Sequence, residues 1–332
     1  MEYSVRSKSI IDSYPVDNFL PDIGIDKVRE ELTDGLTSSP KFIPSKYFYD
    51  KKGSLLFEEI TELDEYYPTR TEKSILADFL PLLNLNFTDL SIIELGSGDP
   101  SKISLLFEQI SPSKLNQIVY YPVDISQSAI ESSISLLTQK YDGRNINGII
   151  ADFIHQVELL PKVNNKLICF FGSTIGNLKR NEIQIFMKKL GAVMQKGDNL
   201  LLGIDMIKDV KILENAYNDS QGVTASFNKN ILNVVNKLLG TNFNPSKFEH
   251  LAFYNNQEQR IEMHLKAKEN LQIEVSSSNV ELQIKQGEMI HTENSHKFNS
   301  KDIQQFAYWG GLNMENVFND ENNWFSLVHY RK

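Results

Sequence analysis

The sequence predicts an α/β protein built on a mostly parallel sheet, and three observations support this fold class. From residue 90 onward, short apolar segments of strand length alternate with amphipathic segments of helix length. The first apolar segment, residues 92–95, runs directly into Gly96-Ser97-Gly98. The second ends at Asp124, about where a nucleoside ribose lies in such sheets. Together these features predict a nucleoside-cofactor site at the carboxyl edge of the sheet.

Parallel strands joined by crossover helices explain the first part of this pattern. Ser126 and Asn181 are expected to cap two of the helices, because their side chains accept hydrogen bonds from free backbone N–H groups. Ligands of such sheets bind at the carboxyl ends of the strands, where Gly96, Asp124, Asp152 and Gly172 fall. The predicted strands are 92–95, 118–123, 146–151, 167–171 and 199–205, and the predicted helices are 101–110, 126–140 and 181–195.

After residue 205 the alternation changes. We expect helices at 210–217, 228–239 and 300–309, antiparallel strands at 250–255, 260–267, 279–284 and 288–293, and a closing hairpin of 314–319 with 324–330. A parallel core with an antiparallel last strand is the Rossmann-like arrangement of class I methyltransferases, and the added segments predict an inserted α+β lobe. We therefore predict a sheet domain of residues 71–206 with 298–332, and a discontinuous substrate-binding lobe of residues 1–70 with 207–297.

Composition excludes several classes of protein. The chain has 332 residues, 41% of them hydrophobic, and a net charge of −9 without a compensating basic block, which argues against a nucleic-acid partner. No segment approaches the roughly 20 apolar residues that span a bilayer, and the first residues lack a signal-peptide pattern. Cys169 lies in an apolar run and is expected to be a buried small hydrophobe. The histidines show no metal-ligand spacing, so we expect no metal site. The missing signal-peptide and membrane-spanning patterns predict a cytoplasmic enzyme.

The residues after the glycines bear on which cofactor binds. Gly96 allows a tight turn and Gly98 lets the backbone approach a ligand. A dinucleotide fingerprint has a third glycine where Ser101 stands, next to Lys102. A lysine there suits the carboxylate of an amino-acid-bearing cofactor such as S-adenosylmethionine. Gly-x-Gly after a strand also occurs in ordinary turns, and Asp124 favours the functional interpretation.

Tyrosines are concentrated upstream of this site, in residues 46–54 and 63–70, among Gly, Pro and charged residues. Such a segment fits a loop that lines a site, because tyrosine combines an apolar face with a phenol that needs a hydrogen-bond partner. Ordinary tyrosines packed between two lobes are the alternative interpretation.

From about residue 40 to its end the chain resembles the histidine-specific Nα-methyltransferases of ergothioneine biosynthesis. The resemblance rests on residues 47–50, 65–70, 94–98, 171–177, 216–219, 222–228, 260–263 and 292–298, which read YFYD, EYYPTR, ELGSG, FGSTIGN, AYND, GVTASFN, RIEM and TENSHKF. It implies an enzyme that uses S-adenosylmethionine to methylate the α-amino group of L-histidine three times, and we expect this enzyme to be a monomer. The product would be histidine betaine (hercynine), the first intermediate of that pathway.

The resemblance also implies roles for individual residues. The cofactor would be held by Gly96, Lys102, Asp124, Asp152 and Phe153. Histidine would be bound by Tyr66, Asn177, Tyr217, Met263, Glu293, Asn294 and Ser295. Tyr49, Asn177 and Tyr217 would act in catalysis, with Tyr49 near the reacting amine.

The pair Glu293 and Ser295 makes chemical sense for an imidazole, which carries one N–H donor and one ring acceptor. Two residues apart on a strand, a carboxylate and a hydroxyl lie on one face. A structural Glu293 capped by Lys297 is the alternative for that residue. The alternatives for the whole chain are a methyltransferase of another aromatic amino acid, a cofactor-binding regulator without catalysis, and a nicotinamide oxidoreductase.

Overall fold

The computed structural model describes residues 14–21, 24–141, 145–276 and 280–332. The chain divides into two compact units. Among the described residues, the sheet unit comprises those from 14 to 20, those of Pro68–Ile207 and those of Lys297–Lys332. The second unit comprises Pro21–Tyr67 and Lys208–His296.

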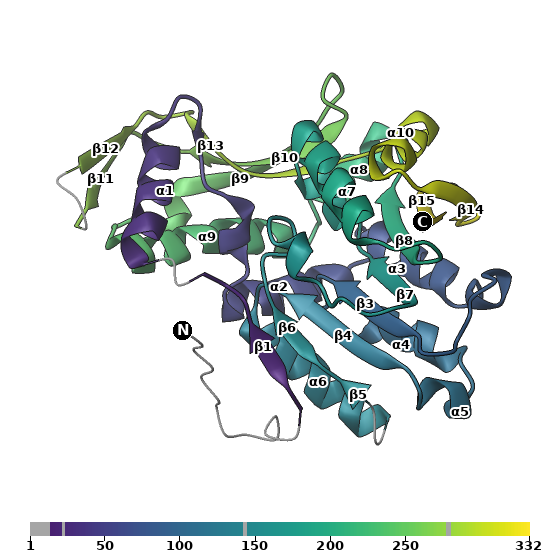
Figure 1. Ribbon diagram of the computed structural model, residues 1–332. Coiled ribbons are helices and arrows are strands. Elements are labelled where there is room, and N and C mark those ends of the chain that lie inside the picture. Colours follow the sequence, from purple (N-terminus) through teal and green to yellow (C-terminus); the bar gives the residue numbers. More distant parts are fainter. Residues whose placement is uncertain (1–13, 22–23, 142–144, 277–279) are drawn as a thin grey trace. The chain divides into compact units, whose positions relative to one another are not determined.

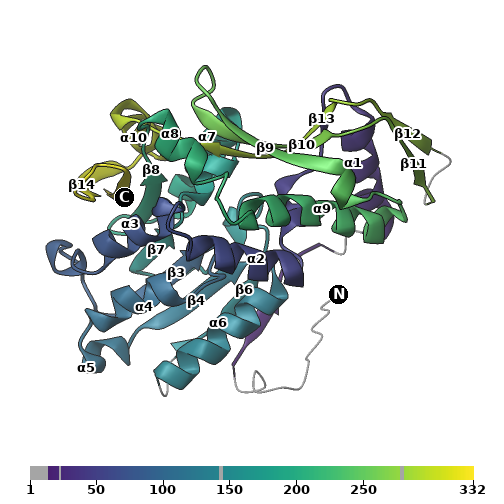
Figure 2. The ribbon, with the colours of Figure 1, turned by 180° about the vertical axis from the view of Figure 1, so that it is seen from behind.

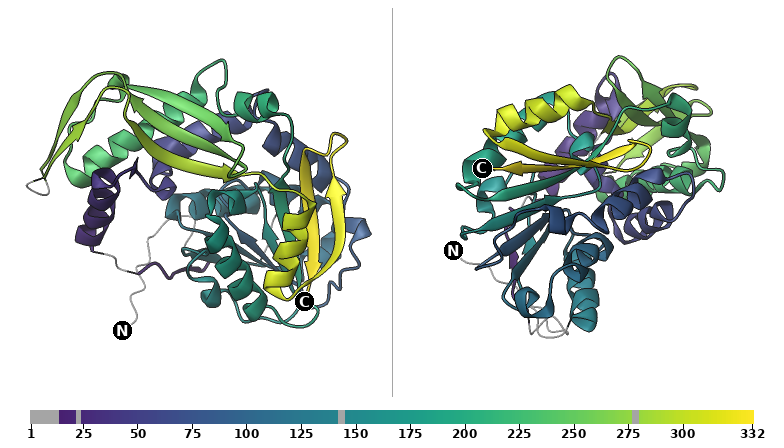
Figure 3. Two further views of the ribbon diagram at one scale, coloured as in Figure 1. Left: turned by 90° about the horizontal axis from the view of Figure 1, so that it is seen from above. Right: turned by 90° about the vertical axis from the view of Figure 1, so that its right-hand side faces the viewer.

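The sheet unit is built around strands in the order β1-β6-β4-β3-β7-β8-β15-β14, with β5 beside β4 (Figure 1). From β1 to β8 these strands run parallel, whereas β15 is antiparallel to both β8 and β14 (Figure 3). This order confirms the predicted class I methyltransferase fold. The strands are β1 (Val16–Asn18), β3 (Ser91–Leu95), β4 (Val119–Asp124), β5 (Asn145–Ile146), β6 (Gly148–Ile150), β7 (Lys166–Phe170), β8 (Asn199–Asp205), β14 (Asn313–Asn319) and β15 (Phe325–Arg331).

Helices cover both faces of this sheet, so its strands are apolar on both sides. Ile92 of β3 packs into one core and its neighbour Ile93 into the other. The first core includes side chains from α3 (Tyr67–Leu76), η3 (Leu80–Leu82), α4 (Ser101–Glu108), α5 (Pro112–Leu115) and α6 (Gln127–Lys140). The second includes side chains from η4 (Val157–Leu159), η5 (Thr174–Asn177), α7 (Arg180–Val193) and α10 (Ser300–Gly310). Cys169 is fully buried, as predicted, and burial raises the pKa of its thiol.

The second unit contains a sheet in the order β2-β13-β10-β9. Helix α9 (Val223–Leu239) lies along β9 and β10 and also packs on α1 and α2 (Figure 2). The other elements are α1 (Ile25–Thr37), β2 (Lys41–Phe42), η2 (Ser45–Phe48), α2 (Lys51–Thr61), α8 (Val210–Asn215), η6 (Pro245–Lys247), β9 (Phe248–Asn255), β10 (Arg260–Ala267), β11 (Leu271–Val275), β12 (Val280–Ile284) and β13 (Met289–His296).

Several local expectations were wrong. Residues 16–18 were assigned to the inserted lobe, but as β1 they pair with β6 in the large sheet. The tyrosine-rich segment is mainly helical, because Asp50 caps α2 by accepting the N–H of Gly53 at 2.7 Å. Asn181 lies inside α7, where Glu182 instead accepts the N–H of Lys179 at 2.8 Å. Strand β11 was not predicted. Residues 1–13, 22–23, 142–144 and 277–279 of the predicted domains, including the first residue of the predicted strand 279–284, lie outside the described part of the chain.

Within the described ranges, no helix combines the length and apolar character needed to cross a bilayer.

Candidate active site

The turn after β3 lies beside the end of β4. Gly96 has a φ of 73°, which residues with a Cβ adopt only with strain. The N–H groups of Gly96 and Ser97 donate to the carbonyl of Val123 at 2.8 and 3.2 Å. A Cβ on Gly98 would lie 3.8 Å from an Asp124 carboxylate oxygen and would meet no other atom within 4 Å. An open glycine next to a carboxylate fits the sugar of a nucleoside-bearing cofactor.

Two polar groups at this turn, a buried hydroxyl and a half-buried carboxylate, fit a ligand. The Ser97 hydroxyl has no hydrogen-bond partner among the described residues. Burial raises the pKa of Asp124 to about 6, and hydrogen bonds from the N–H groups of Ser126 and Ile125 oppose this effect. Asp124 is therefore largely ionised at neutral pH and accepts hydrogen bonds, the property needed to bind ribose hydroxyls.

Asp152 and Phe153 follow β6 and so reach the same edge of the sheet. A Cβ on Gly96 would lie 3.6 Å from the Phe153 ring. That ring also packs edge-on against Phe170, with 5.5 Å between ring centroids. The Asp152 carboxylate lies 2.8 Å from Nδ1 of the exposed His155. Gly96, Asp124 and Phe153 thus line one edge, as the order of parallel strands requires.

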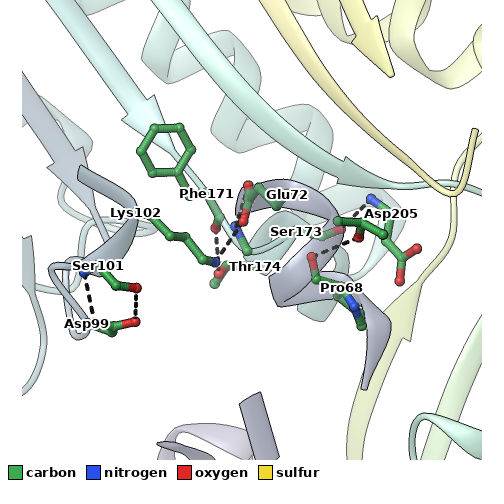
Figure 4. Close-up of polar contacts among 11 residues, drawn as sticks. Pro68, Glu72, Asp99, Ser101, Lys102, Phe171, Ser173, Thr174 and Asp205 are labelled. Atoms are coloured by element: carbon green, nitrogen blue, oxygen red, sulfur yellow. Dashed lines mark hydrogen bonds and ion pairs between the residues drawn. The ribbon is translucent and has the colours of Figure 1, made fainter. Parts of the chain in front are cut away.

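Lys102 has a partner that the sequence did not reveal (Figure 4). Its Nζ lies 2.7 Å from the Glu72 carboxylate, which is fully buried. The two Glu72 oxygens also accept the N–H of Gly172, each at 2.9 Å. An ammonium has three donors, so an ion pair with Glu72 leaves capacity for a ligand carboxylate. Glu72 therefore links α3, α4 and the end of β7 at the predicted cofactor site.

Replacing Glu72 with glutamine is expected to reduce the free energy of unfolding by about 3 kcal/mol, because it removes one partner of a buried ion pair. Urea unfolding of Glu72→Gln, Lys102→Met and the double variant measures the coupling. A coupling energy of about 1–3 kcal/mol is expected. Additive effects of the two substitutions on the free energy of unfolding would show that the Glu72–Lys102 ion pair does not stabilise the fold.

Asn177 ends η5, at the same edge of the sheet unit. Ser173, immediately before η5, has a left-handed φ of 54°. Its hydroxyl accepts the N–H of Asp205 at 2.9 Å, which ties the turn to the end of β8. The turn therefore places Asn177 on the edge that also carries Asp124.

In the second unit, the residues expected to read an imidazole lie on one face of the β10–β13 pair. Met263 pairs in register with Glu293, and Ile261 pairs with Ser295. Met263, Glu293 and Ser295 are 2%, 8% and 7% exposed. The phenol of Tyr217 donates to the Ser295 hydroxyl at 2.8 Å. A carboxylate, a hydroxyl pair and a thioether thus lie close together in a largely buried environment.

Aromatic contacts connect the predicted tyrosines of the second unit. Tyr49 packs edge-on against Phe57 and Phe227, with centroids 5.9 and 6.0 Å apart. Tyr66 contacts Phe57 at 6.3 Å and Tyr217 at 6.2 Å. Tyr49, Tyr66 and Tyr217 therefore belong to one aromatic cluster. Each ring in it has an electropositive edge and electronegative faces.

Asn294 differs from its two neighbours. Strand alternation directs it to the face opposite Glu293 and Ser295, and its Oδ1 lies 2.9 Å from Nε2 of His291. It therefore belongs with a polar cluster on the outer face rather than between the two residues. His264 of that cluster stacks on Phe253 and lies 3.7 Å from Glu262. Nowhere in the described ranges do His, Cys, Asp or Glu side chains form a group of three suited to a metal ion.

The outer face should make stability depend on pH. Burial and then His291 lower the pKa of His264 from 6.5 to about 4, although Glu262 opposes them. As the pH falls below 6.5, His264 binds a proton in the unfolded chain but stays neutral in the folded chain. The free energy of unfolding should therefore decrease as the pH is lowered from 6.5 to about 4. The expected loss is on the order of 3 kcal/mol, since one pKa unit corresponds to about 1.4 kcal/mol. Urea unfolding at several pH values, compared with His264→Phe, isolates this contribution; equal pH profiles would contradict it.

Lys297 was the alternative partner considered for Glu293. Its Nζ forms an ion pair with Asp205 at 2.7 Å, and both side chains are 1% exposed. This pair lies within the sheet unit, where Phe298 also bridges to Met206.

Comparison with known proteins gives consistent matches. A family described as histidine-specific, S-adenosylmethionine-dependent methyltransferases matches residues 28–332. A histidine N-alpha-methyltransferase of Mycolicibacterium smegmatis is 36% identical over 92% of this chain and 95% of its own length. Ergothioneine biosynthesis protein 1 of Schizosaccharomyces pombe is 28% identical over 82% of this chain and 36% of its own length. An L-tryptophan methyltransferase of Psilocybe serbica is 25% identical over 92% of both chains.

Proposed function

Because the chain belongs to the family of histidine-specific, S-adenosylmethionine-dependent methyltransferases, we propose that it methylates the α-amino group of L-histidine. Three transfers give histidine betaine, the first step of ergothioneine biosynthesis. The observation that carries this proposal is the 36% identity to a histidine N-alpha-methyltransferase over 92% of the chain. We further propose a cytoplasmic monomer that acts on this small molecule, without a nucleic-acid or membrane partner.

The sheet unit would bind the donor. S-adenosylmethionine supplies an electrophilic methyl group on a sulfonium. Asp124 would accept hydrogen bonds from the ribose hydroxyls, and Lys102 would hold the amino-acid carboxylate. Asp152 would accept from the adenine amino group, and Phe153 would pack against the base. The open space at Gly98 beside Asp124 supports this placement.

The second unit would recognise the acceptor. Histidine's imidazole offers one N–H donor and one ring acceptor, which match the Glu293 carboxylate and the Ser295 hydroxyl. Tyr217 donates to Ser295 and so fixes the direction of that hydroxyl. Tyr66 and Met263 would complete the pocket with apolar surface. A buried carboxylate and a hydroxyl on one strand face support recognition of a ring that both donates and accepts.

Methyl transfer needs alignment more than covalent catalysis. Well-aligned reactants gain on the order of 7–11 kcal/mol from proximity and orientation. Asn177 and Tyr217 would orient the amino and carboxylate groups, and Tyr49 would line the path to the amine. The amine must lose its proton before each transfer, and we propose that water accepts it. The aromatic edges around Tyr49 would tolerate a tertiary amine better than an ionic clamp would.

A methyltransferase of tryptophan or a tryptophan derivative is the second candidate, favoured by the relative from Psilocybe serbica. An indole has one N–H donor and no ring acceptor, so it could donate to the Glu293 carboxylate but could not accept a hydrogen bond from Ser295. A cofactor-binding regulator without turnover is the third.

Incubation of the purified chain with S-adenosylmethionine and each of the twenty amino acids separates these candidates. Mass spectrometry should find products with one, two and three added methyl groups from L-histidine. Methylation of tryptophan in place of histidine would overturn the proposed substrate. No turnover of any amino acid, with the donor bound, would favour the regulator.

A further inference from the structure

A closed series of hydrogen bonds begins and ends on β13, on either side of Glu293. Thr292 Oγ1 donates to Asn228 Oδ1 at 2.8 Å, and Asn228 Nδ2 lies 2.8 Å from His250 Nδ1. His250 Nε2 lies 2.8 Å from the Tyr217 carbonyl oxygen. The Tyr217 phenol then returns to Ser295. The series joins α9, β9 and the segment after α8 to Thr292 and Ser295, which lie before and after Glu293 on β13.

The orientation of the Asn228 amide follows from its neighbours. Asn228 is fully buried, and its Nδ2 also lies 3.0 Å from the carbonyl oxygen of His264. A carbonyl oxygen only accepts hydrogen bonds, so the NH₂ group must face it. The second hydrogen of that NH₂ group then points at His250, and Oδ1 receives the Thr292 hydroxyl. A flipped amide would set two acceptors against each other.

The same reasoning fixes the tautomer of His250. The Tyr217 carbonyl requires a proton on Nε2, and the Asn228 NH₂ group requires a bare Nδ1. Both requirements are met by the neutral Nε2–H tautomer. An imidazolium would set the Nδ1 proton against the Asn228 amide. Burial lowers the pKa of His250, and Lys229 also lowers it, while the Tyr217 carbonyl and Asp219 raise it; the net shift favours the neutral ring.

The segment that carries Tyr217 has a second attachment to β9, through the side chain of Asn218. Asn218 Nδ2 donates to the carbonyl of Ala252 at 3.0 Å, so consecutive residues are bonded to the strand. The His250 bond acts on Tyr217 itself, one residue earlier, where the side chain that reaches Ser295 begins. Loss of the His250 bond would remove the link between the Tyr217 carbonyl and β9, while the same peptide would keep the bond from the Asn218 N–H to the Asn215 carbonyl at 3.2 Å.

We propose that His250 is a positioning residue for acceptor recognition. In its neutral Nε2–H tautomer it holds the Tyr217 carbonyl and so sets the Tyr217–Ser295 hydroxyl pair beside Glu293. This inference rests on the proposed function, because it assigns the acceptor to that pair. His250 does not contact the reacting atoms in this assignment. Its contribution is mainly to the affinity for histidine, with a smaller contribution to the transfer, because Tyr217 is also assigned to orient the substrate's amino and carboxylate groups.

Steady-state kinetics of His250→Ala and His250→Gln test the proposal. Loss of one hydrogen bond should raise the KM for histidine about tenfold in His250→Ala and lower kcat by a smaller factor, with donor affinity changed by less than about twofold. A glutamine amide carries a donor for the Tyr217 carbonyl and an acceptor for Asn228, so His250→Gln should recover most of the affinity. A matched control is His329→Gln, because His329 is a buried histidine bonded to Asn199 at 2.9 Å in the sheet unit. Its KM for histidine should equal that of the wild type.

An unchanged KM in His250→Ala would overturn the proposal, as would equal losses in the alanine and glutamine variants. A parallel fall of kcat and donor affinity would indicate a general structural role and would also overturn it. If the wild-type chain does not methylate histidine, the proposed function fails first. These results are distinguishable because the wild type is assayed on its own.

Nitrogen NMR of the wild-type chain with labelled histidine residues keeps the proposal testable if a variant does not fold. The His250 signals should show a protonated Nε2 and a bare Nδ1 at neutral pH. The opposite tautomer, or rapid exchange between the two, would contradict the hydrogen-bond series and overturn the assignment.

Discussion

Replacing Glu293 with leucine is expected to lower kcat/KM for L-histidine by about 100-fold, since truncating one partner of a buried charged hydrogen bond costs about 2–5 kcal/mol. Glu293 is 8% exposed, so little water can take the place of the lost carboxylate. The imidazole N–H would be left without the carboxylate acceptor in a largely buried environment. Steady-state kinetics with saturating S-adenosylmethionine measures the change. Donor affinity should stay within about twofold, because the carboxylate is assigned to the acceptor alone.

Two further variants make this test specific. Glu293→Gln retains an acceptor but not the charge, and should fall between the wild type and Glu293→Leu, because charge-assisted hydrogen bonds are about twice as strong as neutral ones. Asn294→Ala is the matched control from the opposite face of β13, and should change kcat/KM by no more than about threefold, as expected for a single exposed or half-buried hydrogen bond. A larger loss in Asn294→Ala than in Glu293→Leu would contradict the assignment of the two faces.

Replacing Asp124 with alanine is expected to weaken S-adenosylmethionine binding by about 100-fold, since two hydrogen bonds to a charged group contribute about 1.5 kcal/mol or more each. Binding of the wild type should also depend on pH. Burial raises the pKa of Asp124 to about 6, so affinity should be full above that pH and fall as the pH drops through it. Isothermal titration calorimetry at several pH values measures both effects.

Asp124→Asn is the control for this pH dependence. An amide keeps an acceptor for the Ser126 N–H, which the carboxylate receives at 2.8 Å, but it does not titrate. Its donor affinity should therefore be intermediate and should not fall as the pH drops through 6. Wild-type affinity in the alanine variant, or an unchanged pH profile in the asparagine variant, would exclude Asp124 from the ribose site.

The sheet and its ligand edge were predictable because they follow from local patterns. Apolar residues on both faces of β3 and β7 mark buried parallel strands, and parallel strands bring Gly96, Asp124 and Phe153 to one edge. The position of Asn294 was also within reach, because the two-residue period of a strand separates it from Glu293 and Ser295. Our placement of Asn294 between those residues did not apply that period.

Other features depend on contacts that no local pattern carries. Glu72 binds Gly172, 100 residues away, and it lies just after the tyrosine-rich segment 63–70, where no local pattern marks it. Asn228 and His250 look like an ordinary helix residue and an ordinary strand residue until α9 packs on β9. Strand β1 is short, and its pairing with β6 crosses more than a hundred residues. A sequence without an alignment offers no signal for such pairings, since tertiary contacts alone create them.

The most direct test of this account is where the methyl groups are placed on the acceptor. The purified chain would be incubated with S-adenosylmethionine and L-histidine, and the products fragmented in a tandem mass spectrometer. The account predicts that every added methyl group resides on the α-nitrogen and that the imidazole remains unmodified. Methyl groups on a ring nitrogen, or histidine recovered unchanged while another amino acid is methylated, would contradict it.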